Sequence, residues 1–400
     1  MTKIIGLLKS MKIKPYTYER VLHKRGNCLS NGMLYDCIKL RREHFGIRHL
    51  PYDNFDYKKA LNKNCENMIG YTRIPTGIIG PVNIDDRENV VPFATTEGAL
   101  VSSINRGVKL LNKCETNIII EDVGMTRAPI VRCPDIKYIK KLKRWILDNY
   151  VDIKNVFETD SRHTELQEIT FLQEGQHLHI RFRATTGDAM GMNMVGKGSD
   201  HVLRYIKQIF EEITIVTLSG NTCTDKKANA INWIDGRGKR VIMEAVIPKG
   251  DLHKILHVSP REMQYLNTQK NLVGSSLAAT LGGNNCNTSN VVAGIFLATG
   301  QDIGQVGTSS QSIINLIENN DRLISTLTMP CLEVGTVGGG TSLEDQENNI
   351  NTITKDSDNK TERLAKNIVY CVMACELSLL SSLCNNDLIN AHMKFNRGYD

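Results

Sequence analysis

The sequence predicts an α+β fold, and three observations support this prediction. Strand-like runs alternate with amphipathic helical runs between residues 129 and 218, which indicates a small α+β unit. From 260 to 316 the chain is apolar and rich in small residues, as expected of closely packed, buried helices. A further apolar run at 363–383 predicts one more buried helix.

The elements can be assigned in chain order. Residues 1–64 predict short helices and turns, and the glycines and prolines of 61–84 predict a turn-rich entry to the main fold. A helix is predicted at 95–111, where apolar residues recur at helical spacing and Thr95 or Thr96 can cap the first turn. In the small unit we expect strands at 130–133, 168–172, 177–184 and 214–218, and helices at 139–150 and 201–213. The last strand is expected to be part of a buried apolar run.

Charge is distributed unevenly along the chain. Residues 1–50 hold eleven Lys/Arg and three Asp/Glu, a surplus of eight within the total of +6, so the remaining 350 residues carry a net −2. This basic segment suits phosphates or acidic lipid, but a solvated helical face is the commoner role. Zinc-finger spacing and aromatic–basic interleaving are both missing, so no nucleic-acid partner is expected. Residues 342–361 are almost wholly polar and predict a surface or disordered loop.

Composition indicates a globular, cytoplasmic and soluble protein. Apolar runs such as 291–300 are too short for a membrane span, and no signal segment opens the chain. The eleven cysteines include no C-x-x-C pair, and Cys371 and Cys375 fit core thiols in a reducing compartment. His177 and His179 share one side of a predicted strand without Cys or acidic partners nearby, so we expect a partly exposed pair and no metal.

The stretch TGDAMGMNMVGKGSD, residues 186–200, has part of a phosphate-loop pattern. Gly191, Gly196 and Lys197 match G-x-x-x-x-G-K, but Gly198 stands where magnesium binding needs Ser or Thr, which argues against an NTPase. The remaining feature is a Gly/Met-rich turn opening a helix, whose backbone N–H groups suit a dinucleotide pyrophosphate. A second glycine segment at 335–341 allows close approach of a ligand, and an ordinary Rossmann fingerprint is missing.

Four isolated polar residues stand out. Lys226 lies between two apolar runs, in a loop that is either simply exposed or delivers a cation into a site. Glu97 starts a predicted helix, where the helix dipole favours an acid, whereas Asp302 ends an apolar helix, where it does not. His392 follows the last buried helix. Each position has an ordinary structural explanation, and composition does not say whether the four converge.

Taken together, long motifs in the chain resemble the hydroxymethylglutaryl-CoA reductase family, in its eukaryotic-type class I branch. They run in family order from about residue 51 to 397. The motifs are ENMIGYTRIPTGIIGP, TTEGALVSSINRG, VGMTRAPIVR, TTGDAMGMNMVGKG, SGNTCTDKKANAINWIDGRGK, KNLVGSSLAATLGGNN, GQDIGQVGTSS, MPCLEVGTVGGGT and NAHMKFNR. The resemblance covers the catalytic part without the membrane region of many eukaryotic members.

The resemblance implies a fold and a reaction. The expected architecture is a large helix-rich α/β domain around a long central helix (65–128 and 219–400), a small inserted ferredoxin-like domain that binds NADP (129–218), and a helical N-terminal segment (1–64). The expected reaction is the reduction of hydroxymethylglutaryl-CoA to mevalonate and free CoA with two NADPH, without metal, in a homodimer or homotetramer with shared active sites.

The resemblance also assigns residues. Lys226 would stabilise the oxyanion, Glu97 and Asp302 would handle protons, and His392 would protonate the CoA thiolate. Substrate groups fall on Arg127, Ser219, Asp225, Lys227, Lys270 and Asn290, and CoA groups on Ser103, Asn105 and Arg106, expected on the exposed side of the 95–111 helix. The cofactor would contact Asp188, Met190, Gly191, Met192 and Asn193, with Gly338, Gly339 and Gly340 opposite. Asn287 stands where animal members have histidine, so a catalytically silent CoA-binding homologue is the alternative.

Overall fold

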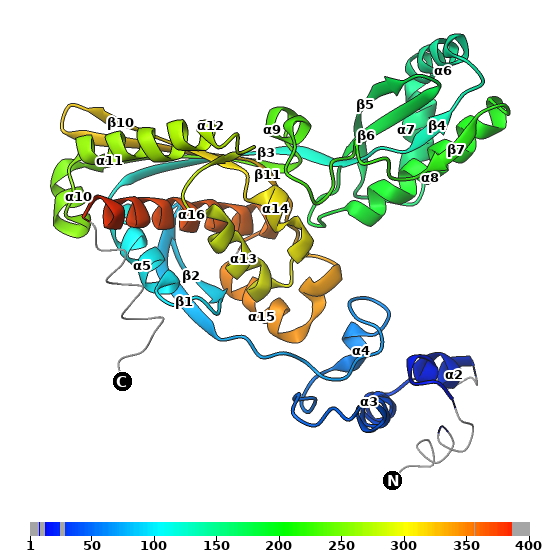
Figure 1. Cartoon of the computed structure of the whole chain (residues 1–400), viewed down its shortest axis with the longest axis horizontal. Helices are drawn as coiled ribbons and strands as arrows, with labels where there is room; N and C mark the ends of the chain where they lie inside the picture. The colour runs from blue at the N-terminus through cyan, green and yellow to red at the C-terminus, as the bar shows by residue number, and fades with distance from the viewer. Residues whose placement is uncertain (1–7, 9–12, 25–28, 356, 386–400) are drawn as a thin grey trace.

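The computed structural model describes residue 8 and residues 13–24, 29–355 and 357–385. Its N-terminal part consists of short helices: η1 (Pro15–Thr17), α2 (Tyr18–Lys24), α3 (Asn31–Phe45) and α4 (Tyr57–Ala60). Figure 1 shows this segment in blue, below the main body. Arg41 of α3 is 1% exposed and donates to both carboxylate oxygens of Glu19 at 2.7 Å, which ties α3 to α2. The predicted short helices are confirmed over the described part of 1–64.

The sheet of the large unit contains, in spatial order, β3 (Glu115–Arg127), β8 (Gly238–Pro248), β11 (Arg322–Leu332), β10 (Ser312–Asn319) and β9 (Gly283–Asn284). Neighbouring strands are antiparallel except β9, which runs parallel to β10. The last residues of β3, Met125 to Arg127, leave β8 and pair with a strand of the small unit. β3 therefore joins the two units, as the cyan strand in Figure 1 shows.

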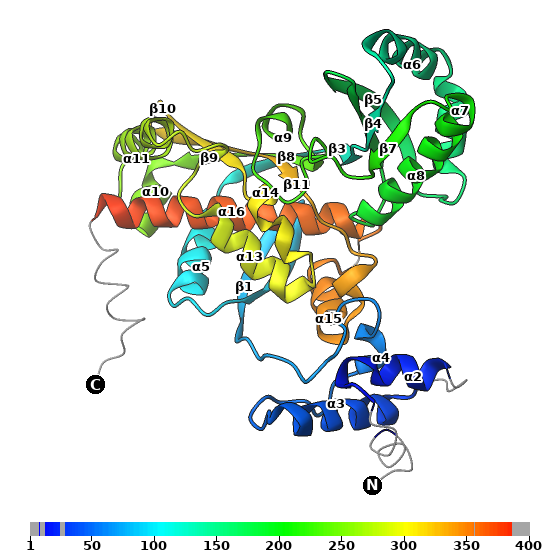
Figure 2. The same cartoon turned by 45° about the vertical axis from the view of Figure 1, so that its right-hand side comes forward.

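The long helix α16 (Lys360–Cys384) is the centre of the large unit. Figures 1 and 2 both place it between the sheet and a layer of α5 (Leu100–Leu111), α13 (Thr288–Thr299) and the antiparallel hairpin of β1 (Thr76–Ile84) and β2 (Arg87–Ala94). Cys371 and Cys375 are fully buried, as predicted for core thiols. The helix is long and apolar enough for a membrane span, but 78% of its apolar window is buried inside the fold.

The small unit has the predicted alternation of strands and helices. Its elements are β4 (Ile130–Arg132), α6 (Ile136–Asp148), α7 (Tyr150–Glu158), β5 (Glu165–Glu174), β6 (His177–Thr185), α8 (Met192–Ile209) and β7 (Thr214–Thr217). β7 and β5 lie at opposite edges of its sheet, with β4 and β6 between them. The prediction that the apolar run 213–218 is buried holds at Ile213 but is wrong for β7 itself, since Ile215 and Val216 are 39% and 51% exposed at the edge of the sheet.

The remaining helices connect these parts. They are α9 (Ala230–Asp235), α10 (Lys249–Leu256), α11 (Pro260–Asn267), η2 (Thr268–Gly274), α12 (Ser275–Leu277), η3 (Ile303–Gln305), α14 (Val306–Ser309), η4 (Gly339–Ser342) and α15 (Glu344–Ile353). Buried apolar side chains form one core cluster around α16 and a second among β4 to α8. We propose that these clusters correspond to a large domain of 65–128 and 219–400 and an inserted domain of 129–218.

Three local predictions need correction. The polar stretch 342–361 contains α15, which buries Ile350 and Ile353, one turn apart, and has three acids in its first turn where the helix dipole favours them. The turn-rich entry at 61–84 includes β1, which accommodates Pro81 at a break in its register with β2. The helix predicted from Thr95 begins only at Leu100, because Ala99 adopts a left-handed conformation.

Candidate active site

Lys226 lies in the loop between β7 and α9. Its Nζ is 2.8 Å from Oδ2 of Asp302, and both side chains remain partly exposed. The hydrogen bond to Asp302 raises the pKa of Lys226, and Asp225 and Glu333 raise it further against the opposing effect of partial burial. Lys226 is therefore held as an ammonium ion that can donate to a ligand.

Asp302 does not end a helix as predicted. α13 stops at Thr299 with Gly300 in the left-handed conformation, and the Asp302 carboxylate accepts a hydrogen bond from the Gly304 N–H at 3.0 Å as the cap of η3. An N-terminal cap is a favourable place for an acid, so the local fold stabilises Asp302 while its second oxygen faces Lys226.

A pocket of about 740 Å³ opens in front of this pair. It lies where the small unit meets the large unit, and Arg127 contributes a buried Nε that has no hydrogen-bond partner. Its other lining residues are Lys63, Asn64, Ala189, Met190, Gly191, Met192, Asn193, Met194, Asp225, Lys226, Gly300, Gln301, Asp302, Ile303, Gly335, Val337, Gly338, Gly339, Gly340 and Thr341. An unpaired buried guanidinium nitrogen beside an ammonium suits an anionic ligand.

The two glycine-containing segments predicted from the sequence meet in this pocket. Gly191 has φ +92°, and a Cβ there would lie 2.3 Å from the Thr186 side chain. A Cβ at Gly335 would lie 2.3 Å from the Met190 N, so both glycines are needed for the close approach. Asp188 does not line the pocket. It accepts hydrogen bonds from the Thr336 and Thr361 N–H groups and fastens the turn to the large unit.

Glu97 lies outside the pocket of Lys226 and Asp302 within one chain. It sits in the turn before α5, where its N–H donates to Thr95 Oγ1, so it does not start the helix as predicted. Its Oε2 accepts from Asn290 Nδ2 at 3.2 Å. Neither residue is among those lining the pocket of Lys226 and Asp302. The described part of one chain thus brings together two of the four expected catalytic residues, and His392 lies outside the described residues.

The remaining predicted residues fall into two groups. Ser219, Lys227 and Lys270 are exposed. Ser103, Asn105 and Arg106 are half-buried, so their prediction as an exposed face of α5 is wrong. Ser103 bonds Ser378, Asn105 bonds β1 through Gly80 and Ile78, and Arg106 donates to Ser378, Ser381 and Ser382 of α16. These groups face other elements because α5 lies between β1 and α16.

A second hollow, which the sequence did not predict, adjoins the pocket of Lys226 and Asp302 at Met194. Arg162, His163, Lys197 and His201 line it, in the turn before β5 and on the first turns of α8. Asp160 pairs with Lys197 at 2.7 Å. The Ser-Arg-His run at 161–163 was the available signal. Among the described residues there is no group of three or more metal-ligating side chains, and His177 and His179 are both partly exposed.

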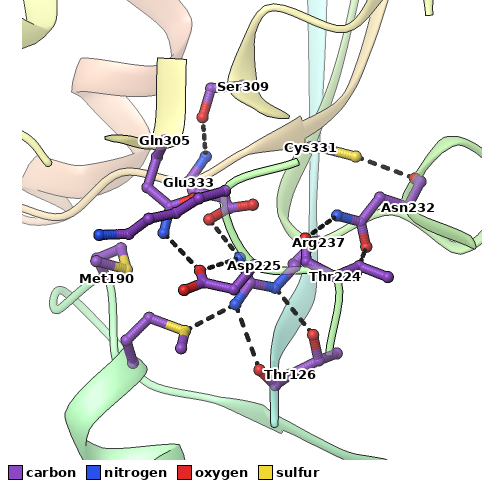
Figure 3. Close-up of polar contacts among 12 residues, drawn as sticks. Thr126, Met190, Thr224, Asp225, Asn232, Arg237, Gln305, Ser309, Cys331 and Glu333 are labelled. Carbon is purple, nitrogen blue, oxygen red and sulfur yellow. Dashed lines mark hydrogen bonds and ion pairs between the residues drawn. The ribbon is translucent and has the colours of Figure 1, made fainter. Parts of the chain in front are cut away.

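Sequence reasoning also passed over Arg237 and Glu333, which form a fully buried ion pair behind Asp225 (Figure 3). Burial raises the pKa of Glu333 to about 7, although Arg237 opposes this effect. An isolated arginine in DGRGK and an isolated acid in the apolar run MPCLEVG were the only signals.

The fold and the pocket together define a class: a two-unit α+β domain whose lysine–carboxylate pair faces glycine-containing loops. The chain belongs to the hydroxymethylglutaryl-coenzyme A reductase family, whose model matches residues 36–397. It is 45% identical over 379 residues to 3-hydroxy-3-methylglutaryl-coenzyme A reductase of Agrotis ipsilon, covering 90% of this chain and 45% of the relative. It is 43% identical over 405 residues to 3-hydroxy-3-methylglutaryl-coenzyme A reductase 2 of Arabidopsis thaliana, covering 99% of this chain and 71% of the relative.

The chain spans about half the length of the insect relatives that it matches. Among solved structures it is similar in fold to a class II 3-hydroxy-3-methylglutaryl-CoA reductase from Streptococcus pneumoniae bound to NADPH, with a TM-score of 0.66 and 16% identity. The similarity covers 92% of this chain and 97% of that one. The predicted family and α+β fold are confirmed.

Proposed function

We propose that this domain reduces hydroxymethylglutaryl-CoA to mevalonate and free CoA with two NADPH. The observation that carries the proposal is the Lys226–Asp302 pair, which faces a pocket lined by both predicted cofactor segments. Family membership supplies the substrate class. The relatives named as this reductase support the same reaction.

Lys226 carries the main electrostatic role in this proposal. NADPH supplies a hydride to the carbonyl carbon when bound. The Lys226 ammonium donates to the carbonyl oxygen as negative charge develops on it, and Asp302 orients that ammonium through its 2.8 Å contact. Glu97 exchanges a proton with the aldehyde oxygen in the second reduction, and His392 protonates the leaving thiolate.

Charged groups around the pocket fit the rest of the substrate. The unpaired Arg127 Nε would receive the carboxylate of the hydroxymethylglutaryl group, with Ser219, Asp225, Lys227, Lys270 and Asn290 around it. Ser103, Asn105 and Arg106 remain proposed CoA contacts, although α16 and β1 now occupy most of their polar atoms. Exchange of those internal bonds for CoA contacts would accompany binding.

The cofactor proposal rests on both hollows. Met190, Gly191, Met192, Asn193 and Gly338–Gly340 would hold the nicotinamide end, while Asp188 keeps their turn in place. The adjoining hollow has Arg162, His163, Lys197 and His201 beside Asp160, and their N–H donors, with the charges of Arg162 and Lys197, suit the 2′-phosphate that distinguishes NADPH from NADH.

An oxidation assay tests the function directly. We expect the purified chain to oxidise NADPH in the presence of hydroxymethylglutaryl-CoA, followed by absorbance, and to release mevalonate. Parallel runs with NADH should show at least about tenfold lower kcat/KM, since one charge-assisted contact contributes roughly 1.5–3 kcal/mol. CoA binding without oxidation of either cofactor would instead favour the silent CoA-binding homologue.

We further propose a homodimer or homotetramer with active sites shared between subunits. Glu97 and Asn290 form a pair outside the Lys226 pocket within one chain, and a site shared between two copies would bring the acid to the ammonium. Coexpressed Glu97→Gln and Lys226→Ala chains should then regain about a quarter of wild-type activity, because half of randomly formed dimers are mixed and each has one intact site. Activity no higher than that of either variant alone, or an active monomer in sedimentation, would contradict shared sites.

A further inference from the structure

Arg237 connects four segments that surround the pocket. It is fully buried, just before β8, and Figure 3 shows its guanidinium at the centre of the polar contacts. Its Nη1 lies 2.5 Å from Glu333 Oε2 and 3.2 Å from Asp225 Oδ1. Its Nε donates to Thr126 Oγ1 at 2.9 Å, and its Nη2 lies 2.7 Å from Met192 Sδ. One side chain therefore contacts the end of β3, the Lys226 loop, the segment after β11 and the start of α8.

The Lys226 loop has an unfavourable backbone. Asn221, Thr224 and Lys226 have φ values of +61°, +63° and +59°, a region that residues other than glycine rarely adopt. Such residues persist only where surrounding contacts hold them in place, and they occur often at functional sites. The position of the Lys226 ammonium therefore depends on whatever fixes this loop.

Arg237 acts on both sides of Thr224 in that loop. On one side, Thr126 Oγ1 accepts from Arg237 Nε and donates its own hydrogen to Cys223 O at 2.7 Å. On the other side, Arg237 contacts the Asp225 carboxylate directly. Since Cys223 and Asp225 flank Thr224, and Lys226 follows directly, the guanidinium fixes the chain immediately before the lysine.

Glu333 holds Arg237 in this position. Its side chain is fully buried, and its backbone N–H donates to Ser309 Oγ at 3.0 Å, which anchors the Glu333 backbone to α14. Burial works against the charge of Arg237, but Glu333 and Asp225 together raise its pKa. Burying two charges costs solvation free energy, and apolar side chains of the same volume often give a fold equal or greater stability. This pair therefore calls for a role beyond packing.

We propose that Arg237, held by Glu333, is a positioning residue for the reaction: it fixes Cys223 and Asp225 so that the strained loop presents Lys226 to Asp302 at the pocket. The inference rests on the proposed function for its kinetic meaning. Arg237 does not line the pocket, so it acts through the loop and not on the substrate.

The test is the double variant Arg237→Met/Glu333→Leu, which removes both buried charges and leaves neither of them unpaired. We expect kcat per NADPH-binding site to fall roughly a hundredfold, because a misplacement of a catalytic group by about 1 Å can lower the rate by that factor. The KM for NADPH should stay within about threefold, since the methionine sulfur that Arg237 contacts is only a weak acceptor. A purely structural role would reduce the number of NADPH-binding sites without this fall in kcat per site.

The matched control is Arg240→Met/Glu121→Leu. Arg240 lies on β8, three residues after Arg237, and its partly exposed ion pair with Glu121 joins β8 to β3 at 3.1 Å outside the pocket. We expect wild-type kinetics from this control. If the double variant fails to fold, Arg237→Lys serves instead. The lysine ammonium is a compact charge without the planar fork through which Arg237 reaches Thr126 and Asp225 at fixed positions, so we expect kcat about tenfold lower.

Hydrogen exchange gives a readout that does not depend on turnover. In the Arg237/Glu333 variant, amides of residues 221–227 should exchange at least about tenfold faster, with α16 unchanged, since local opening depends on the contacts that hold a segment. A kcat within threefold of wild type, or a fall in kcat without faster exchange in this loop, overturns the proposal. If the wild-type chain oxidises no NADPH, the proposed function fails, and loop exchange alone then decides whether Arg237 positions Lys226.

Discussion

Replacing Lys226 with alanine is expected to lower kcat for NADPH oxidation about a hundredfold to a thousandfold, the usual effect of removing one oxyanion donor. The ammonium is held 2.8 Å from Asp302 and raised in pKa by that contact, so it is charged at neutral pH and placed at the pocket. The methyl group of alanine offers no donor to the developing alkoxide. Steady-state assays with hydroxymethylglutaryl-CoA measure the change.

The control for this prediction is Lys249→Ala. Lys249 is also an exposed lysine paired with an aspartate, Asp321, at 2.7 Å, but it lies at the start of α10 outside the pocket. We expect unchanged kinetics from it. NADPH binding by Lys226→Ala, measured by fluorescence titration, should remain within about threefold, because the glycine-containing segments stay in place. A Lys226→Ala enzyme that keeps a tenth or more of wild-type kcat would exclude the oxyanion role.

The second large effect concerns the packing of α5 on α16. Gly107 of α5 meets α16 so closely that a Cβ there would lie 1.9 Å from the Ala374 backbone oxygen. A backbone atom cannot move away by a change of rotamer as a side chain can, so Gly107→Ala must push α5 and α16 apart. We expect the free energy of unfolding to fall by about 3 kcal/mol, at the upper end of overpacking effects. Urea denaturation followed by circular dichroism measures the shift of the transition.

Gly250→Ala is the matched control, because Gly250 also lies in a helix, α10, and a Cβ there would meet no atom within 4 Å. We expect no loss of stability and a gain of up to about 1 kcal/mol, since alanine favours helices more than glycine does. Equal stability of the Gly107→Ala variant and the wild type would show that α5 and α16 are not in backbone contact.

Much of the fold was predictable because it follows local patterns. The alternation in 129–218 and the apolar run of α16 both come from the spacing of apolar residues, which the sequence displays directly. α15 was missed because its buried face consists of little more than Ile350 and Ile353 within a polar stretch. The exposure of Ile215 and Val216 was missed because an edge strand has the same local pattern as a central one.

The candidate site was predictable in composition but not in arrangement. The glycine-containing segments and Lys226 were identified from motifs, and the pocket contains them together. That Glu97 lies outside the Lys226 pocket within one chain could not be predicted, because no local signal says which distant residues line one pocket. Asp302 was expected at an unfavourable helix end, whereas two further residues of chain allow it to cap η3.

By itself, then, the sequence determined the α+β class, the family and the chemical identity of the groups available for catalysis, since these depend on residue types and short-range spacing. Only the tertiary structure decided which groups meet. Arg237 and Glu333 are 96 residues apart, and they form an ion pair only because β8 and β11 are neighbours in one sheet. Long-range pairing of this kind depends on how whole elements pack, which no local pattern encodes.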